Sequence, residues 1–162
     1  MKENVFSASI HPHNKLWGFL EVSNKILGLL IISSILVLDQ ITKAVAGGFL
    51  SVTCNKGVAL GISLAEPFDI VLPIIFIIVI FYFLERESRV ANIISMSMLF
   101  GGGVSNLLDR AIGGCVRDFI PLGLFSTFNV ADAVISLGVV LFLVNIRGST
   151  PDRGRTPTGV GD

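Results

Sequence analysis

Residues 101–138 read GGGVSNLLDRAIGGCVRDFIPLGLFSTFNVADAVISLG, and the rest of the chain is organised around this stretch. Apolar segments lie at both of its ends, and it carries three aspartates, Asp109, Asp118 and Asp132. A carboxylate close to hydrocarbon is costly unless it is paired, hydrated or neutralised. We therefore expect the protein to use at least some of these acids.

The composition is that of a membrane protein. Of the 162 residues, 52% are hydrophobic and only 15% are charged, whereas soluble domains have about 25% charged residues. The mean hydropathy is +0.79. The formal net charge is zero, which leaves no electrostatic case for a nucleic-acid partner.

Four apolar runs predict four transmembrane helices, because about 20 residues are needed to cross the hydrocarbon core. The predicted spans cover residues 26–46, 68–84, 90–108 and 129–146. The loop sequence SVTCNKGVALGIS, at residues 51–63, alternates in a way that suggests short extended pieces around an Asn-Lys-Gly turn. The predicted fold is an all-α integral membrane protein with short extracytoplasmic loops and room for a small β element in the first of them.

The chain divides into a polar cytoplasmic segment at residues 1–23, a membrane domain at 24–147 and a tail at 148–162 that we expect to be disordered. No cleavable signal peptide is expected, since DQITK rather than a small-x-small site follows the first apolar run. Basic residues accumulate near the N-terminus, around residues 86–89 and in the tail. This pattern predicts that both termini are cytoplasmic and that the unusual polar residues face the outer side.

The cysteines and histidines do not predict a metal site. Cys54 and Cys115 lack metal-binding spacing, and His11 and His13 have no cluster of acids or cysteines around them. No metal and no cofactor is expected. Both cysteines fall in predicted outer loops, where they can form a disulfide if the compartment is oxidising. The interpretation that the sequence favours is two separate small apolar residues.

Asp118 and Asp132 come from a loop and from the fourth span, so the fold can bring them together at the membrane surface. Two carboxylates that share a site do not both ionise easily, and one of them keeps a proton. The ionised member can take a proton from water while the other protonates a carbonyl oxygen or a leaving amine. Such a pair needs no metal, serine or thiol.

Purely structural roles account for the same side chains, and the residues alone leave both interpretations open. Asp118 taken singly fits a solvated loop acid. The structural pairs are Asn129 with Asp132 as a capping box, Asp109 with Arg110 as an ion pair that ends the third span, and Asp39 with Lys43 as an ion pair four residues apart in the first span.

Five sequence blocks occur in order: DQITK, NKGVALG, GGGVSNLLDR, GCVRDF and FNVADA. Across residues 26–146 this set resembles the signal peptidase II family of bacterial membrane aspartyl proteases, the lipoprotein signal peptidases. The resemblance implies that Asp118, in the V-x-D-F block, and Asp132, in the F-N-x-A-D block, are the catalytic aspartates. It implies an endopeptidase that acts in contact with membrane lipid. Such an enzyme removes the signal peptide of diacylglyceryl-modified prolipoproteins, on the N-terminal side of the lipidated cysteine.

The resemblance also implies roles for other residues of these blocks. The implied substrate-binding residues are Asn55, Gly57, Asn106, Arg110 and Asn129. The implied supporting residues are Asp39, Lys43 and Asp109. The sequence departs from the family pattern at Ser105, where glycine is usual, at Leu60, where an aromatic residue is usual, and in the short loop between residues 43 and 55.

Two alternatives remain beside the peptidase. A diverged lipoprotein-binding relative would keep the groove without the chemistry, although the presence of both Asp118 and Asp132 argues against it. A small proton-coupled transporter also keeps acids in its membrane helices, but the second and third spans carry no acid in their apolar interiors. The expected location is the bacterial cytoplasmic membrane, with the active site at the outer face. The sequence does not indicate an oligomeric state.

Overall fold

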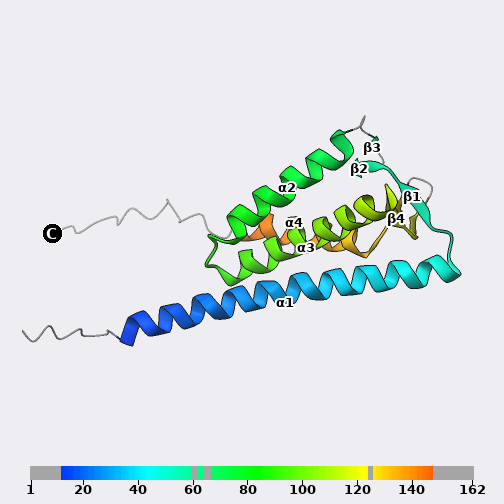
Figure 1. Cartoon of the computed structure of the whole chain (residues 1–162). Helices are drawn as coiled ribbons and strands as arrows, with labels where there is room; N and C mark the ends of the chain where they lie inside the picture. Colours follow the sequence, from blue (N-terminus) through cyan, green and yellow to red (C-terminus); the bar gives the residue numbers. More distant parts are fainter. Residues whose placement is uncertain (1–11, 60–61, 64–66, 124–125, 148–162) are drawn as a thin grey trace, which may run out of the picture.

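The computed structural model describes residues 12–59, 62–63, 67–123 and 126–147. These ranges contain four helices: α1 (Pro12–Phe49), α2 (Phe68–Leu84), α3 (Val90–Gly113) and α4 (Val130–Arg147). Short strands fill the two connections at one end of the molecule (Figure 1). The strands are β1 (Thr53–Asn55), β2 (Gly57–Ala59) and β3 (Ile62–Ser63) in the first connection, and β4 (Val116–Asp118), β5 (Ile120–Leu122) and β6 (Ser126–Phe128) in the second.

The predicted helical membrane fold is confirmed. Three helices contain a stretch long and apolar enough to cross a membrane, namely Leu20–Phe49, Val90–Gly113 and Val130–Arg147. Helix α2 is equally apolar but has 17 residues, which span roughly 25 Å against a hydrocarbon core of about 30 Å. The count of four spans therefore stays a prediction.

Two helices extend further than the sequence predicted. Helix α1 begins at Pro12, so residues 12–23 are continuous with the helix of the first predicted span. Helix α3 continues to Gly113 and is capped by Gly114, whose φ of 72° is left-handed. Asp109 and Arg110 thus lie inside α3 and do not end it, which corrects the expectation of a terminating ion pair. Glycine supplies the C-cap, because it adopts the left-handed conformation without a steric penalty.

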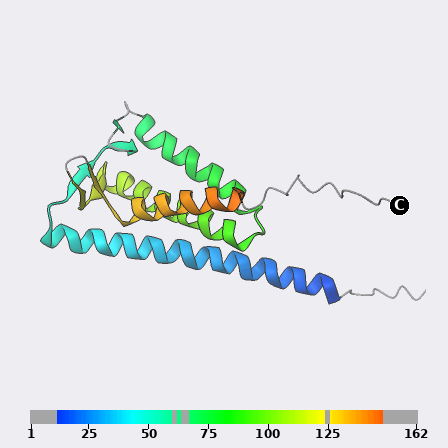
Figure 2. The same ribbon diagram turned by 180° about the vertical axis from the view of Figure 1, so that it is seen from behind.

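Helix α3 is the central element, and α1, α2 and α4 all pack against it (Figures 1 and 2). Its glycines at 101–103 allow this close packing. A Cβ on Gly102 would lie 2.6 Å from Ile135 of α4, which is closer than real Cβ contacts come. A Cβ on Gly101 would lie 3.2 Å from Ile32 of α1, and one on Gly103 would lie 3.3 Å from Ile77 of α2.

The molecule has apolar residues outside and polar residues inside. Large apolar side chains on the outer faces of α1, α2 and α4 are about 60% exposed, for example Leu29, Ile78 and Val144. At the end where the strands lie, the side chains of Asp39, Lys43, Asp118 and Asn129 are almost fully buried. An apolar surface of this kind is stable in hydrocarbon, and the polar groups avoid it by pairing with one another.

The strands connect the two loops. Antiparallel pairing of β1 with β4 sets Thr53 opposite Asp118 and Asn55 opposite Val116. Next to this pairing, Cys54 and Cys115 form a disulfide, which corrects the preference for two separate cysteines. The pairing of β2 with β3 confirms the predicted β element in the connection between α1 and α2. The pairing of β5 with β6 in the second loop was not predicted.

Candidate active site

Asp118 ends strand β4 and is completely buried. Each of its carboxylate oxygens accepts one amide hydrogen bond. Asn55 Nδ2 donates to Oδ2 over 2.8 Å, and Asn129 Nδ2 donates to Oδ1 over 2.7 Å. The donors come from β1 and from the residue before α4, so both strand-containing connections hold this acid in place.

Asp132 lies in the first turn of α4 and is partly exposed. Its Oδ1 accepts a hydrogen bond from Asn106 Nδ2 at 2.7 Å, and its Oδ2 accepts one from the backbone N–H of Asn129 at 3.2 Å. In return Asn129 Oδ1 accepts from the backbone N–H of Asp132 at 2.9 Å. This is the reciprocal capping box that was one of the two interpretations open from the sequence, with an aspartate in place of the usual glutamate.

Asn129 therefore contacts both acids, and its amide has only one workable orientation. A backbone N–H can only donate, so the N–H of Asp132 requires the amide oxygen on its side. The amide nitrogen must then face Asp118 and Asn106, and it donates to Asp118 Oδ1 and to Asn106 Oδ1 at 3.1 Å. Capping and site assembly are consequently two functions of one side chain.

Beneath the two acids lies a buried ionic cluster centred on Lys43. Its ammonium lies 2.6 Å from Asp39 Oδ2 and 3.0 Å from Asp109 Oδ2, and it donates to Asn106 Oδ1 at 3.1 Å. Asp39 Oδ1 in turn accepts from the backbone N–H of Ala131, in the first turn of α4. Lys43 thus pairs with two buried carboxylates, of which Asp109 also pairs with Arg117, and it fixes the amide that contacts Asp132.

Three residues outside the predicted site complete this cluster. Ser105 donates its hydroxyl to Asp39 Oδ2 at 2.6 Å and accepts from Gln40 Nε2 at 3.0 Å. Arg117 Nη2 lies 2.7 Å from Asp109 Oδ1 and donates to Gln40 Oε1 at 2.8 Å. The sequence held a signal for two of them that was missed: Gln40 follows Asp39 in an otherwise apolar run, and Arg117 precedes Asp118. Ser105, a departure from the family pattern, is integrated through its hydroxyl.

Arg110 connects α3 to the connection between α1 and α2. Its Nη2 donates to the backbone carbonyl of Gly57 at 2.7 Å, and Asn55 Oδ1 accepts from the N–H of Gly57 at 2.8 Å. The Nε of Arg110 is buried and has no hydrogen-bond partner among the described residues. Burial of an unpaired guanidinium donor is costly, so this nitrogen is a candidate donor to a bound molecule.

Burial raises the pKa of Asp118 above its ordinary value, and the nearby negative charge of Asp132 acts in the same direction. The hydrogen bonds from Asn55 and Asn129 and the charge of Lys43 oppose this shift without cancelling it. Asp132 accepts two hydrogen bonds and is partly exposed. The two acids thus have different surroundings, as an acid–base pair requires.

The structure brings all ten predicted site residues into one connected set. The two acids and their direct partners are Asp118, Asp132, Asn55, Asn106 and Asn129. Gly57 and Arg110 tie α3 to the strands between α1 and α2, and Asp39, Lys43 and Asp109 form the buried cluster. Among the described residues, no group of three His, Cys, Asp or Glu side chains could hold a metal ion. Leu60, the other departure from the family pattern, lies outside the described residues.

Comparison with known proteins relates the chain to one peptidase family. The family model described as signal peptidase (SPase) II matches residues 31–147. A lipoprotein signal peptidase of Caldicellulosiruptor bescii is 37% identical over 127 residues, covering 69% of this chain and 85% of the relative. One from Aquifex aeolicus is 36% identical over 141 residues, covering 73% and 84%.

Solved structures show the same architecture. Two structures described as bacterial membrane enzymes match with TM-scores of 0.71 and 0.67 at 25% and 26% sequence identity. The first match covers 82% of this chain and 94% of the other, and the second covers 76% and 94%. The arrangement of helices around α3 is therefore shared with enzymes of bacterial membranes.

Proposed function

The chain belongs to the signal peptidase II family, and we propose from this premise that it is a membrane aspartyl endopeptidase that processes lipid-modified precursor proteins. The observation that carries the proposal is the placement of Asp118 and Asp132 on either side of Asn129. The side-chain amide of Asn129 donates to the loop acid and its backbone N–H donates to the helix acid, so one residue holds both acids, in different surroundings, at the end of a membrane bundle. Two acids in this relation supply the base and the acid for peptide hydrolysis.

We assign the shared proton to Asp118 and the negative charge to Asp132. Burial raises the pKa of Asp118, which favours its protonated form. Asp132 accepts hydrogen bonds on both oxygens and is partly exposed, so it can contact water as a carboxylate. General acid–base catalysis of this kind contributes typically about 10²- to 10⁴-fold to the rate.

The hydrolytic step follows from this assignment. Asp132 takes a proton from water as the water oxygen bonds to the carbonyl carbon, and Asp118 gives its proton to the carbonyl oxygen. The resulting diol collapses when Asp132 passes its proton to the leaving amine and Asp118 recovers one from a hydroxyl. The C–N bond breaks, one water is consumed, and both acids return to their starting protonation states.

Asn55, Gly57 and Arg110 surround the place where the substrate backbone would lie. Arg110 Nη2 is already held by the carbonyl of Gly57, while its Nε has no partner among the described residues. We propose that this nitrogen donates a hydrogen bond to a backbone carbonyl of the bound peptide. A planar guanidinium can make both hydrogen bonds at once, which an ammonium does less well.

The expected substrate is a prolipoprotein whose cysteine carries diacylglyceryl, cleaved on the N-terminal side of that cysteine. Relatives of this chain are named lipoprotein signal peptidases. The acids lie at the end of helices long enough to cross a membrane. Acyl chains can then remain in hydrocarbon while the peptide bond reaches the acids at the surface.

We propose that the acids face the outer side of the bacterial cytoplasmic membrane and that both termini are cytoplasmic. The start of α1 and the end of α4 lie at the end of the bundle opposite the strands (Figure 2), and basic residues accumulate at that end. Reporter fusions test this topology. Fusions at Lys56 and Pro121 should read as outside and a fusion after Gly148 as inside, whereas an outside reading at Gly148 would contradict the orientation.

One cleavage experiment tests the activity. Purified protein in detergent is given a diacylglyceryl-modified precursor and the same precursor without lipid. Mass spectrometry should show one cut, directly before the lipidated cysteine, and a much slower reaction without the lipid. A protein that binds the lipidated precursor without cutting it would instead be the non-catalytic relative.

A further inference from the structure

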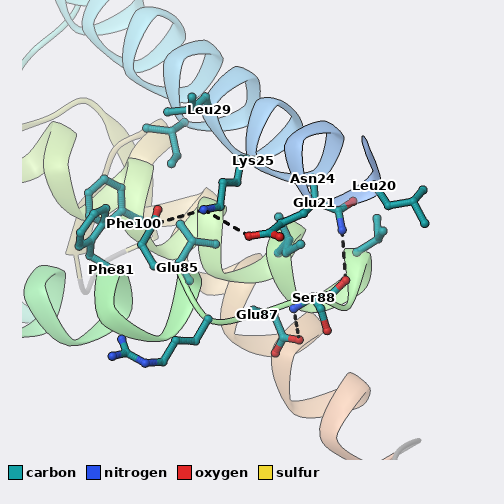
Figure 3. A pocket seen from close by; sticks show the side chains of 16 residues that line it. Leu20, Glu21, Asn24, Lys25, Leu29, Phe81, Glu85, Glu87, Ser88 and Phe100 are labelled. Atoms are coloured by element: carbon teal, nitrogen blue, oxygen red, sulfur yellow. Dashed lines mark hydrogen bonds and ion pairs between the residues drawn. The ribbon is translucent and has the colours of Figure 1, made fainter. Parts of the chain in front are cut away.

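A cavity of about 620 Å³ lies far from the acids, at the other end of the bundle. It is enclosed by the first half of α1, the end of α2, the turn between α2 and α3, and the start of α3. Figure 3 shows the side chains that line it, with Lys25, Glu21 and Glu85 close together at one side. Neither the catalytic acids nor their partners line this cavity.

The lining has an apolar part and a charged part. The apolar part consists of Leu29, Ile32, Phe81, Leu84, Ile93 and Phe100. The charged part holds three acids, Glu21, Glu85 and Glu87, against two bases, Lys25 and Arg86. The charge of the lining is therefore negative by one. A site of this kind fits an apolar segment that ends in positive charge.

Two of the glutamates have capacity for a further cation. Glu87 is already engaged, because its carboxylate accepts from the backbone N–H groups of Ser88 and Arg89 and from Asn92 Nδ2. Glu21 and Glu85, by contrast, share Lys25, whose ammonium lies 3.7 Å from each of them (Figure 3). All three side chains are about half exposed or more, so an incoming ligand can reach them.

The other base does not compensate for these acids. Arg86 lies over the ring of Tyr82, with its guanidinium carbon 3.6 Å from the ring centroid, and Nη1 donates to the carbonyl of Tyr82. Its charge is thus directed into a contact within α2. Glu21 and Glu85 remain the acceptors with the least engagement in this part of the structure.

The distance between the cavity and the acids matches the length of a signal peptide. Nineteen residues of α3 separate Val90, at the cavity, from Asp109, beneath the acids. At 1.5 Å per residue this is about 29 Å. A signal peptide has 15–30 residues, with a positively charged N-terminal region followed by an apolar stretch. About 20 helical residues would cover the same distance.

We propose that this cavity binds the positively charged N-terminal region of the substrate's signal peptide, with its cations at Glu21 and Glu85. The inference rests on the proposed function and adds a second recognition site to it. The lipidated cysteine lies at the acids, and the apolar stretch runs along the bundle. The basic end reaches the carboxylates at the opposite membrane surface. Recognition at both ends sets which bond lies at the acids.

The test compares two lipidated precursors, one with two lysines in the N-terminal region and one with glutamines in their place. The wild-type protein should show a KM about five- to tenfold higher for the glutamine precursor at low salt, since two exposed charge contacts each contribute modestly. High salt should shrink the difference. As a matched control, lysine-to-glutamine changes after the cysteine should leave KM unchanged.

The double variant E21Q/E85Q supplies the second half of the test. It should cleave the lysine precursor with the raised KM and should no longer distinguish the two precursors, with kcat close to that of the wild type. A thermal melt confirms that the half-exposed substitutions leave the fold intact. If the KM of the double variant rises equally for both precursors, the effect of the glutamates does not depend on the lysines of the precursor. The glutamates then act through the lipid or through the packing of the helices, and the proposal is wrong.

The failure of this inference is distinguishable from that of the proposed function. A wild-type protein that cleaves both precursors with equal KM would overturn the second recognition site and leave the peptidase intact. A wild-type protein that cleaves neither, while folded, would overturn both.

Discussion

Replacing Asn129 tests whether one amide both caps α4 and orients Asp118. The Asn129→Ala variant loses the cap on the N–H of Asp132 and the donor to Asp118. A cap contributes about 1 kcal/mol, and a hydrogen bond to a neutral group about 0.5–1.5 kcal/mol. The sum is about 1.5–2.5 kcal/mol, which corresponds to a fall in Tm of roughly 3–10 °C for a chain of this size.

The Asn129→Asp variant separates the two functions. Aspartate is as good a cap as asparagine, so α4 should keep its first turn. The donor to Asp118 is replaced by an acceptor, which adds a third carboxylate to the site and raises the pKa of Asp118 further. At mildly acidic pH, we expect the Tm of Asn129→Asp to lie closer to that of the wild type than to that of Asn129→Ala. At neutral pH, we expect Asn129→Asp to cleave at least about a hundredfold more slowly than the wild type.

The assay measures both quantities on one preparation of each variant in detergent: a thermal melt from pH 5 to 8 and cleavage of a lipidated precursor. Asn129→Ser is the matched control, because its shorter side chain keeps the cap and carries no charge. Near-native cleavage by Asn129→Asp at neutral pH would refute the role of the amide nitrogen. In that case Asn129 would be a helix cap and nothing more.

Three further predictions concern the surrounding residues. Burial raises the pKa of Asp118. The contribution of Asp118 to stability is therefore present at low pH and is lost as the pH rises through its folded-state pKa. Between pH 4 and 8, the Tm of the wild type should fall relative to that of Asp118→Asn. Lys43→Met should lower the free energy of unfolding by about 3–5 kcal/mol, because two buried carboxylates lose their shared cation. A Tm within 2 °C of the wild type would contradict this prediction. Arg110→Lys should melt normally but cleave at least about tenfold more slowly, a loss of roughly 1.4 kcal/mol; unchanged cleavage would make Arg110 purely structural.

The helices and their order were predictable from the sequence because a membrane span requires a long apolar run. The ends were less predictable. Helix α1 includes the polar residues near its start, since a helix outside the hydrocarbon can contain charged residues. Helix α3 continues past Asp109 and Arg110, which are buried against other elements, and ends only at Gly113, before the glycine cap.

The strand pairing and the disulfide could not be predicted. Strands β1 and β4 have three residues each, which is too short for an alternating pattern to appear. Their pairing joins two loops that are far apart in the sequence, and the proximity of Cys54 to Cys115 depends on it. Without knowledge of the β1–β4 pairing, the positions of the two cysteines in the sequence gave no reason to prefer a disulfide.

The site was predicted in part. Asp118 and Asp132 were predicted to converge because a loop acid and a helix acid share one membrane face. The family motifs named their amide partners. The roles of Gln40 and Arg117 were missed, since both depend on Asp109 lying inside α3 and accepting from them. The hydroxyl of Ser105 likewise acts only through the packing of α1 against α3.

The central claim is that Asp118 and Asp132 activate water together, and a comparison of their asparagine variants tests it most directly. Asparagine is nearly isosteric with aspartate but cannot act as a general acid or base. Single-turnover cleavage of the lipidated precursor by Asp118→Asn and by Asp132→Asn should each be slower by about 10²- to 10⁴-fold, with both variants folded and membrane-inserted. Near-native cleavage by either folded variant would contradict the account.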